Sequence, residues 1–395
     1  MRADVAIVGA GCAGLSLAAR LADAGPRAGR VVLLDERTTF ARDRTWCFWD
    51  VHPHPFAAAV THRWARWRVR GPDCTDVVRT STRYAYQHVP ADAFYAAALA
   101  RVAAAPHVEL RLGERADAVA DARDARVAVV VHTTHGALHA AHVFDSRPGP
   151  PPARADQLRA GYPDPRPHAT RLVQAFAGAV VRTAAPVFDA GTATLMDFTA
   201  DQPGDGFPFG YVLPYSAHEA LVELAMIAER APTAAVLEAA LARYAARLTG
   251  GVHVTRSREA GVIPMDAALV ERRPSPRVTR IGVAGGMAKP STGYAFLAIQ
   301  RDSAALARAV VTSVLGQASR PRGSVARWLD HVFLRRLHAA PTAAPALFTR
   351  LFAVADPDAL VRFLSDVGSP GDAARVITAL PPLPFVAEAC RLAAA

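Results

Sequence analysis

The segment Asp4-Val-Ala-Ile-Val-Gly-Ala-Gly-Cys-Ala-Gly14 decides the fold of this chain. It starts as a short strand rich in β-branched residues, continues into the pattern Gly9-x-Gly11-x-x-Gly14, and leads into a helical run from Leu15 to Ala24. In such a unit the glycines make a tight turn, let the backbone approach a pyrophosphate, and bring helix and strand close together. The segment therefore predicts a Rossmann-like domain that binds a dinucleotide.

A second strand supports this interpretation. Val31-Val-Leu-Leu34 ends in Asp35, about twenty residues beyond the glycines, where a carboxylate accepts hydrogen bonds from ribose hydroxyls. The alternative is a tight turn between strand and helix that holds no ligand. Strand, glycines, helix, second strand and acid all occur in the expected order, which favours the binding site.

A second glycine-rich segment, Ile281-Gly-Val-Ala-Gly-Gly-Met-Ala-Lys-Pro-Ser-Thr-Gly-Tyr-Ala-Phe296, lies late in the chain. It resembles the second FAD motif of flavoproteins with the hydroxybenzoate-hydroxylase fold, where a strand, a glycine turn, a proline and a helix N-terminus meet the ribitol and isoalloxazine. We expect the strand at residues 280–284 and the helix from near residue 291 through Ala307. The resemblance implies that FAD contacts the glycines and hydroxyl residues of this segment, namely Gly285, Gly286, Ser291, Thr292 and Gly293.

Two residues of this segment are unusual. Most flavoproteins of this fold have an aspartate at the place of Gly286, so the ribitol contact must come from elsewhere in this chain. Lys289 is the single lysine among 45 lysine and arginine residues. Lysine offers a compact, strongly hydrated point charge that arginine does not, which favours a charge beside flavin or phosphate. The alternative is a chance survivor on a solvated turn.

Composition limits the remaining classes of function. A chain of 395 residues with 51% hydrophobic residues can bury a large core and is expected to form two interleaved domains. The net charge of +10 comes from arginines that are spread along the chain, so nucleic-acid binding is not expected. Attraction to anionic lipid headgroups is the better interpretation. We find neither a spanning apolar run nor a secretion signal, and expect a cytoplasmic protein that associates peripherally with membranes.

The cysteines predict neither disulfides nor a metal site. Four cysteines are scattered along the chain without paired spacing, as is typical of a reducing cytoplasm. Cys47, His52 and His54 lie close together, but they lack the two-plus-two spacing of zinc ligands. We therefore expect no metal ion.

Periodicity and turn residues divide the chain into three parts. We expect an FAD-binding domain of residues 1–60, 100–158 and 276–318, a β-rich substrate domain of residues 61–99 and 159–275, and a C-terminal helical region of residues 319–395. A hairpin is expected at residues 127–132 and 137–144, and one strand at Trp64–Arg70. The proline-rich run from Arg147 to Arg154 is a natural crossing between the domains. Five strands are expected in the substrate domain, at residues 171–176, 193–198, 210–213, 220–227 and 261–264.

Several segments together resemble one family, the bacterial lycopene β-cyclases. The matching segments cover nearly the whole chain and occur in the family's order: Arg44-Thr-Trp-Cys-Phe-Trp49, Gln174-Ala-Phe-Ala-Gly178, Phe188-Asp189, Leu195-Met-Asp-Phe198, Gly210-Tyr-Val-Leu-Pro214, Leu221-Val-Glu223, Glu259-Ala-Gly-Val-Ile-Pro-Met265 and the segment from Gly285 to Phe296. In addition, Val143-Phe-Asp-Ser-Arg147 resembles the segment in which many flavoproteins of this fold return to the cofactor domain, which places Asp145 at the cofactor.

The family resemblance implies a reaction without net oxidation or reduction. Protonation of the terminal double bond of a linear ψ end gives a carbocation, an internal double bond closes the ring, and proton loss gives the β-ring. Substrate and product are isomers, and reduced FAD, with NAD(P)H as the expected reductant, stabilises the cationic transition state. The expected partner is a carotenoid dissolved in a membrane, and the sequence leaves protein partners open.

Glu223 is the expected proton donor. A carboxylic acid that protonates an alkene must stay neutral in an apolar pocket, and Glu223 stands in the apolar run Ala220-Leu-Val-Glu-Leu-Ala-Met226. On the residues alone, a glutamate at the edge of the core that pairs with a distant arginine is the alternative, and the family resemblance favours the donor. Many members carry a second acid and a threonine after it, where this chain has Leu224 and Ala225.

Aromatic residues are expected to face the carbocation, and half of them can equally be plain core. Three other functions stay open: a cyclase of another terpenoid or of one carotenoid end, a flavin monooxygenase or dehydrogenase, and a flavin-binding module without catalysis. A redox enzyme would consume NAD(P)H with substrate, whereas a binding module would tolerate loss of Glu223. The expected substrate-binding aromatics are Trp46, Phe48, Trp49, Phe207, Phe209 and Tyr211.

Overall fold

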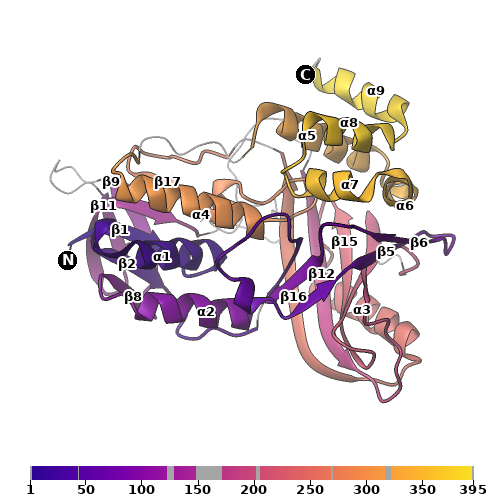
Figure 1. Cartoon of the computed structure of the whole chain (residues 1–395), viewed down its shortest axis with the longest axis horizontal. Helices are drawn as coiled ribbons and strands as arrows, with labels where there is room; N and C mark the ends of the chain where they lie inside the picture. Colours follow the sequence, from indigo (N-terminus) through magenta and orange to yellow (C-terminus); the bar gives the residue numbers. More distant parts are fainter. Residues whose placement is uncertain are drawn as a thin grey trace.

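The computed structural model describes residues 2–42, 44–121, 129–147, 171–201, 205–267, 270–315 and 322–393 (Figure 1). Most of the predicted proline-rich crossing lies outside the described residues. The same holds for the predicted domain boundaries at residues 158 and 318.

The first sheet contains the N-terminal strand at its centre. Its order is β8-β2-β1-β11-β10-β9, and β17 pairs with β11. Strands β8, β2, β1, β11 and β17 are parallel, whereas β11, β10 and β9 form an antiparallel meander, which confirms the predicted hairpin. The strands are β1 (Arg2–Val8), β2 (Val31–Asp35), β8 (Val108–Leu112), β9 (Ala116–Asp121), β10 (Val129–Thr133), β11 (Gly136–Asp145) and β17 (Val278–Arg280).

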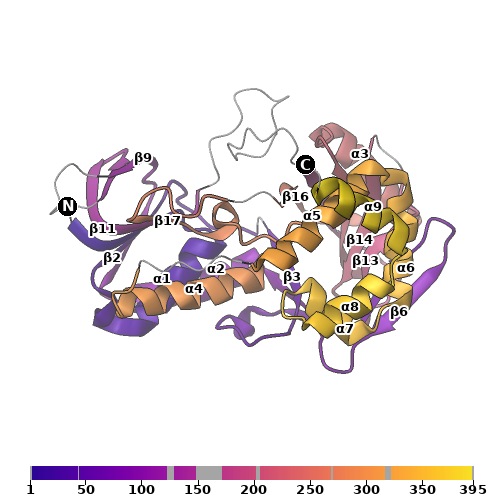
Figure 2. The same ribbon diagram turned by 90° about the horizontal axis from the view of Figure 1, so that it is seen from above.

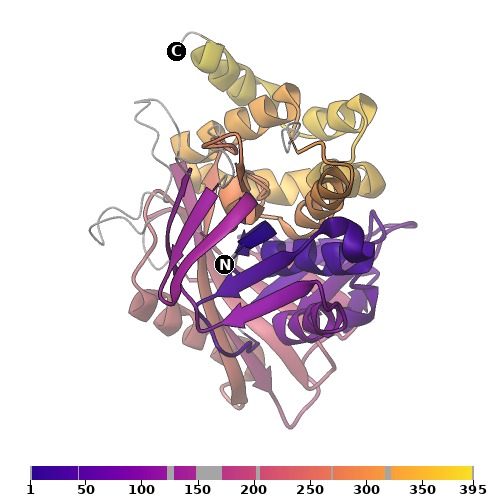
Figure 3. The same cartoon turned by 90° about the vertical axis from the view of Figure 1, so that its left-hand side faces the viewer.

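Three helices cover one face of this sheet, α1 (Cys12–Ala24), α2 (Ala91–Ala103) and α4 (Phe296–Val311) (Figure 3). Their apolar residues form one buried core with Val5, Ile7 and Leu33 of the sheet. The opposite face buries Ala6 and Val8 against the β10–β11 hairpin. Because both faces are covered, β1 and β2 are apolar along nearly their whole length, as is typical of parallel strands.

The second large sheet forms the other half of the molecule (Figure 1). Its order is β16-β12-β15-β14-β13-β5-β6. Helix α3 (Ala234–Thr249) covers one face, and the C-terminal helices cover part of the other. The five strands predicted for the substrate domain are present and most are longer than expected. The strands are β5 (Arg66–Arg70), β6 (Asp76–Thr80), β12 (Arg171–Arg182), β13 (Thr192–Asp197), β14 (Phe207–Pro214), β15 (Glu219–Ala228) and β16 (Val254–Asp266).

A small sheet joins the two halves, with the order β3-β7-β4 (Thr45–Trp49, Tyr86–Pro90 and His62–Trp64). The single strand predicted at Trp64–Arg70 is wrong, because the chain leaves β4 at Ala65 and enters β5 in the large sheet. Trp64 and Trp67 are three residues apart and cannot share one face of a regular strand. Both indoles are buried because they lie in different sheets.

The second glycine-rich segment also differs from the expectation. The strand β17 ends at Arg280, and a 3-10 helix, η4 (Gly282–Gly285), occupies most of the predicted strand. Gly282 and Gly286 have φ of 65° and 80°, which β-strands do not use. The helix α4 begins at Phe296, later than predicted, and lies alongside α1 (Figure 2).

The C-terminal region is helical as predicted. Its helices are α5 (Ser324–Ala339), α6 (Ala344–Val354), α7 (Pro357–Leu364), α8 (Pro370–Thr378) and α9 (Pro382–Ala393). Within the described ranges, no single helix has the length and apolar character to cross a membrane. The bent pair α8 and α9, at 119°, passes that test only when both helices are taken together.

The division into domains stays a prediction. The expected boundary between residues 99 and 100 falls inside α2. Phe94, Ala98 and Val102 of this helix belong to the core on the first sheet.

Candidate functional site

The three fingerprint glycines take three different positions at the start of α1. Gly9 has φ of 92°, and a Cβ on Gly14 would lie 1.9 Å from the carbonyl oxygen of Gly9. Both positions therefore require glycine for the turn itself. Gly11 differs, because it has φ of −77° and, among the described residues beyond its two chain neighbours, no heavy atom lies within 4 Å of the place of its Cβ. The space in front of Gly11 is open at the helix N-terminus.

The first turn of α1 is suited to a phosphate group. Gly11 is the N-cap, no side chain caps the helix, and the first turn carries no acidic residue. Uncapped N–H groups and the helix dipole favour an anion at this end. Together with the open space at Gly11, these features fit the pyrophosphate of a dinucleotide.

Asp35 is buried at the end of β2 and braces the fingerprint turn. Its Oδ2 accepts from the N–H of Ala10 at 2.5 Å, and its Oδ1 accepts from Nε of Arg37 at 3.0 Å. Burial acts to raise the pKa of this carboxyl, but the hydrogen bonds from Arg37 and Ala10 hold it below its usual value. The carboxylate therefore stays charged next to the site. Its contact with a ribose remains a prediction.

Asp145 ends β11 beside the same turn. Its carboxylate is held by Nε and Nη2 of Arg147, at 3.0 and 2.8 Å. Its carbonyl accepts from the N–H of Ile281 at 2.9 Å, which ties the two glycine segments together. The sequence analysis missed Ser146, whose hydroxyl donates to the carbonyl of Val8 at 2.8 Å and fills the space beside Gly9.

The two glycine-rich segments meet in space, as a single cofactor site requires. A Cβ on Gly282 would lie 2.8 Å from the Cβ of Ala13 in the first turn of α1. Gly285 is similarly constrained, since its Cβ would lie 2.5 Å from the carbonyl of Arg280. Gly286 caps η4 with a left-handed conformation. The backbone of the second segment therefore approaches the fingerprint helix closely.

Lys289 is buried, so the solvated-turn alternative is wrong. Its Nζ lies 2.7 Å from Oδ1 of Asp366 and 3.2 Å from Oδ1 of Asp330, both in the C-terminal region. Arg322 also contacts Asp366, at 2.6 Å. Lys289 thus ties the glycine segment to the C-terminal helices, and its predicted role beside the flavin stays a prediction.

The end of the glycine segment faces both halves of the molecule. Ser291 donates to Asp330 at 2.5 Å, and the hydroxyl of Thr292 accepts from the N–H of Tyr294 at 3.2 Å. Gly293 has φ of 73°, and its Cβ would lie 2.9 Å from Cγ2 of Ile263 in β16. The predicted cofactor segment therefore lies directly against the large sheet.

Glu223 stands in the middle of β15 and faces away from α3. Its neighbours Leu221 and Ala225 belong to the core beneath the C-terminal helices, as the alternation of the strand requires. Leu224 lies on the opposite face, in the core with α3. An acid at position 224 would therefore point away from Glu223, whereas Ala225 shares its face.

A second glutamate, which the sequence analysis missed as an acid, faces Glu223. Glu259 of β16 and Glu223 of β15 both stand opposite Gly178 of β12, on its two sides. A Cβ on Gly178 would lie 2.8 Å from Cγ of Glu223 and 3.2 Å from Cγ of Glu259. The glycine leaves the space in which the two side chains approach each other, so that Glu259 acts directly on the carboxyl group of Glu223.

The two carboxyl groups change the acidity of Glu223. Although Glu223 keeps some accessible surface, the surrounding protein removes most of its hydration. This burial, together with the charge of Glu259, raises the pKa of Glu223 well above its usual value. Glu223 is therefore a carboxylic acid that holds its proton where an exposed glutamate is ionised.

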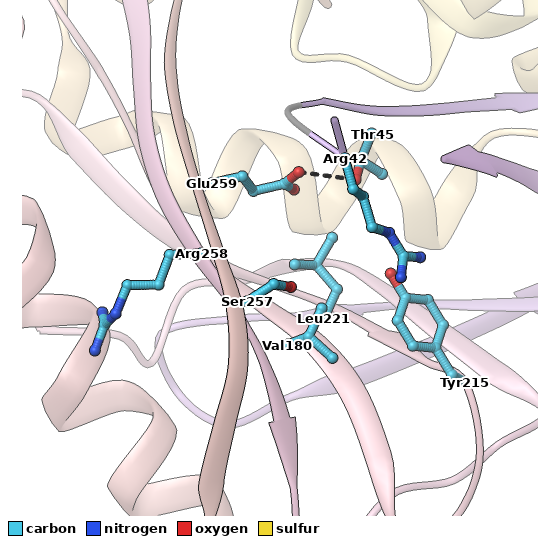
Figure 4. Close-up of a pocket in the computed structure, with 8 residues that line it drawn as sticks. All are labelled: Arg42, Thr45, Val180, Tyr215, Leu221, Ser257, Arg258 and Glu259. Atoms are coloured by element: carbon cyan, nitrogen blue, oxygen red, sulfur yellow. Dashed lines mark hydrogen bonds between the residues drawn. The ribbon is translucent and has the colours of Figure 1, made fainter. Parts of the chain in front are cut away.

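Glu259 borders a small cavity between β16 and the loop before β3 (Figure 4). Its Oε2 accepts from the hydroxyl of Thr45 at 3.0 Å, and Arg258 on the same strand points the opposite way. Arg42 and Tyr215 line this cavity and also an adjoining one of about 560 Å³. The wider cavity is polar, with residues that include His62, Arg182, His218 and Glu219.

A group of hydroxyls leads from Tyr211, which stands opposite Glu223, to the glycine segment. Tyr211 of β14 stands opposite Glu223, and its hydroxyl lies 3.0 Å from that of Tyr86. Tyr86 in turn lies 3.3 Å from the hydroxyl of Tyr294, next to Gly293. Burial raises the pKa of all three phenols, so they are neutral hydrogen-bonding groups. The sequence predicted Tyr211 but not its two partners.

The predicted aromatic residues divide between two faces. Trp49 lies with Tyr86 and Tyr294, at ring distances of 4.8 and 5.8 Å. Trp46 and Phe48 project from the other face of β3 and pack against Phe296 of α4, in the core of the first sheet. The structure therefore does not bring Trp46 and Phe48 to Glu223. The alternation of side chains along β3 could have predicted that they face away from Trp49.

Phe207 and Phe209 share the face of Glu223 but pack into the core with the C-terminal helices. Phe207 lies 6.0 Å from the ring of Phe348 in α6, and Phe209 lies 6.2 Å from Phe198. Cys47, on the face of β3 that carries Trp49, contacts Tyr211. In the part of the chain that the structure describes, no three His, Cys, Asp or Glu side chains are grouped to hold a metal ion.

Comparisons with known proteins agree with this geometry. A family model described as lycopene cyclase protein matches residues 4–390. No curated protein matches the chain in a sequence comparison.

Three solved structures share the fold. A geranylgeranyl bacteriochlorophyll reductase-like protein from Thermoplasma acidophilum has a TM-score of 0.64 and 12% identity over 98% of each chain. The p-nitrophenol 4-monooxygenase from Pseudomonas putida DLL-E4 has a TM-score of 0.56 and 19% identity, over 94% of this chain and 93% of that one. Aklavinone-11 hydroxylase, solved with FAD and aklavinone, has a TM-score of 0.56 and 16% identity over 87% of this chain and 69% of that one. The predicted α/β flavoprotein fold, of the hydroxybenzoate-hydroxylase type, is confirmed.

Proposed function

The chain belongs to the lycopene cyclase family, and we propose that it is an FAD-dependent lycopene β-cyclase that converts linear ψ ends to β-rings as an isomerase. The observation that carries this proposal is Glu223, a carboxylic acid held neutral on a largely apolar sheet face beside buried aromatic rings. An acid of this kind is what protonation of a carbon–carbon double bond requires.

FAD fits the residues at the other end of the site. The open space at Gly11, the uncapped α1 and the approach of Gly282 to Ala13 are suited to its pyrophosphate and the adjoining groups. Bound in its reduced form, with NAD(P)H as reductant, FAD supplies negative charge that stabilises a cationic transition state. Gly9, Gly11, Gly14 and the segment from Gly285 to Gly293 would hold it.

The chain's own residues account for the steps at the substrate. Glu223 donates its proton to the terminal double bond, and its carboxylate is then available near the carbocation. Trp49 and the tyrosines present ring faces and exclude water, and each ring face over a cation contributes about 0.5–2 kcal/mol when desolvated. We place the protein at a membrane surface, where a carotenoid is dissolved.

Product analysis tests the proposal. Cells that accumulate lycopene should form β-rings when they express the chain, and Glu223→Gln should lower ring formation about a hundredfold to ten-thousandfold at equal FAD content. Glu238→Gln, an exposed position on α3, is the matched control. Near wild-type turnover of Glu223→Gln would remove this residue from the mechanism.

A redox reaction is the alternative that several structural neighbours raise, because they are monooxygenases. Anaerobic assays distinguish the two. A cyclase forms many rings for each NAD(P)H oxidised, whereas one NAD(P)H per product would contradict the proposal.

A further inference from the structure

The large sheet brings a second glutamate next to the proposed acid, on the other side of one strand. Neighbouring strands lie about 4.8 Å apart, so two residues that flank a third strand have backbones about 9–10 Å apart. Glu223 and Glu259 flank β12 in this way. Their side chains meet because Gly178, between them, has no side chain.

We propose that Glu223 and Glu259 form a pair that shares one proton over Gly178, with Glu259 as the positioning residue that keeps the proton on Glu223. This inference rests on the proposed cyclisation and adds a second carboxylate to it. Glu259 is fixed from outside the pair, since its Oε2 accepts from the hydroxyl of Thr45 at 3.0 Å. Its buried Oε1 has no hydrogen-bond partner among the described residues. A protonated Glu223 is the donor that satisfies this oxygen.

The proton and the charges balance around the cycle. The pair starts with one proton and one negative charge. The O–H bond of Glu223 breaks as the C–H bond forms on the terminal alkene carbon, which leaves two carboxylates beside one carbocation. The carbon–carbon bond of the ring forms next. A C–H bond of the ring cation then breaks to give the ring double bond, and that proton returns to the pair.

The groups around the pair favour this cycle. Tyr211 of β14, Cys47 of β3 and Tyr215 are neutral, since burial raises the pKa of each. Thr45 is a neutral hydroxyl donor. Arg42 is a cation that lines the cavity of Glu259, and Arg258 points away from it. Thr45 thus donates to the pair, and Arg42 at the cavity of Glu259 is the cation among these described groups that faces it.

The first test measures proton binding and needs no turnover. In the folded protein the pKa of Glu223 is raised, so its stabilising contribution is present below the usual value of 4.5 and is lost as pH rises through the raised value. Glu223 should therefore add to the free energy of unfolding of the wild type a component that falls with rising pH. Glu223→Gln should remove this fall and Glu259→Gln should reduce it, whereas Glu238→Gln should leave it unchanged.

The second test is the pH profile of ring formation. Glu259→Gln removes the negative neighbour, so the alkaline limit of activity should move to lower pH and activity should recover in acid. Gly178→Ala keeps both carboxyl groups but separates them, and should move the limit in the same direction. Glu223→Gln should not recover at any pH.

The outcomes of these tests distinguish failure of the proposed pair from failure of the proposed cyclisation. If the free energy of unfolding and the rate of ring formation of Glu259→Gln depend on pH as in the wild type, the proposed pair is wrong. Loss of activity at every pH in Glu259→Gln, with activity kept in Glu223→Gln, would overturn the assigned roles. Coupled proton binding in a protein that forms no rings would support the pair and contradict the proposed cyclisation.

Discussion

Gly11 separates cofactor binding from folding at a single residue. Its φ of −77° suits any amino acid, and no heavy atom of the described residues beyond its chain neighbours lies within 4 Å of the place of a Cβ. Gly11→Ala should therefore fold with a nearly unchanged melting temperature, while the methyl group occupies the space for the pyrophosphate. We expect this variant to purify without FAD. Full flavin absorbance in purified Gly11→Ala would contradict the fingerprint assignment.

Lys289 supports a second prediction at the residue scale. Removal of one partner from a buried ion pair leaves an uncompensated charge, which costs about 3–5 kcal/mol. Lys289→Met should lower the free energy of unfolding by this amount, because Asp366 and Asp330 lose their shared cation. Arg83→Met removes an exposed contact with Asp358 and should change the free energy of unfolding by less than about 1 kcal/mol.

The Lys289 effect should depend on pH. Burial acts to raise the pKa of Asp366, but Lys289 and Arg322 lower it below the usual 3.8. The stabilisation is therefore fully present above that value and is lost as pH falls through the lower folded value. Denaturation at neutral and strongly acidic pH should show the difference between wild type and Lys289→Met shrink in acid. A difference that is independent of pH would contradict the ion-pair explanation.

At the scale of elements, local patterns were predictable and register was not. The fingerprint, the β10–β11 hairpin and the strands of the large sheet follow from periodicity and turn residues. Glu259 escaped notice because its partner Glu223 lies far away in sequence and only strand pairing brings them together. In contrast, the opposite faces of Trp46 and Trp49 in β3 were open to prediction from their odd spacing.

The contact between β14 and α3 offers a test of the large sheet. A Cβ on Gly210 would lie 2.0 Å from Cζ of Tyr244, whose hydroxyl donates to Asp197 at 2.9 Å and fixes the ring. Gly210→Ala should lower the free energy of unfolding by about 1–3 kcal/mol, because the helix must move away. Gly371→Ala in α8, with no atom nearer than 3.6 Å, should be neutral or slightly stabilising. Equal melting temperatures for both variants would contradict this packing.

At the scale of the whole molecule, the two glycine segments lie in the half that contains the first sheet, and the acid pair lies in the half that contains the large sheet. Tertiary contacts set the position of one relative to the other. The hydroxyls of Tyr294, Tyr86 and Tyr211 span the distance between them. The sequence alone predicted the two glycine segments and Glu223, but not Glu259. It could not predict the connection, because Tyr86 comes from a third, small sheet.

The molecule also exposes apolar side chains on its C-terminal helices. Leu383 of α9 is 81% exposed and Val386 is 56% exposed, and α5 and α8 expose Trp328 and Ile377. The whole chain has a net charge of +10, and we propose that this end of the molecule contacts the surface of an anionic membrane.

We therefore predict salt-sensitive binding to vesicles. The protein should sediment with anionic vesicles at low ionic strength and less at high salt, because the screening length falls to about 3 Å at 1 M. A double variant, Leu383→Ser with Val386→Ser, should bind more weakly at every salt concentration. Val252→Ser removes a side chain that is 71% exposed after α3 and should bind like the wild type. If all three proteins bind equally, or bind neutral and anionic vesicles alike, the C-terminal helices are not the membrane contact.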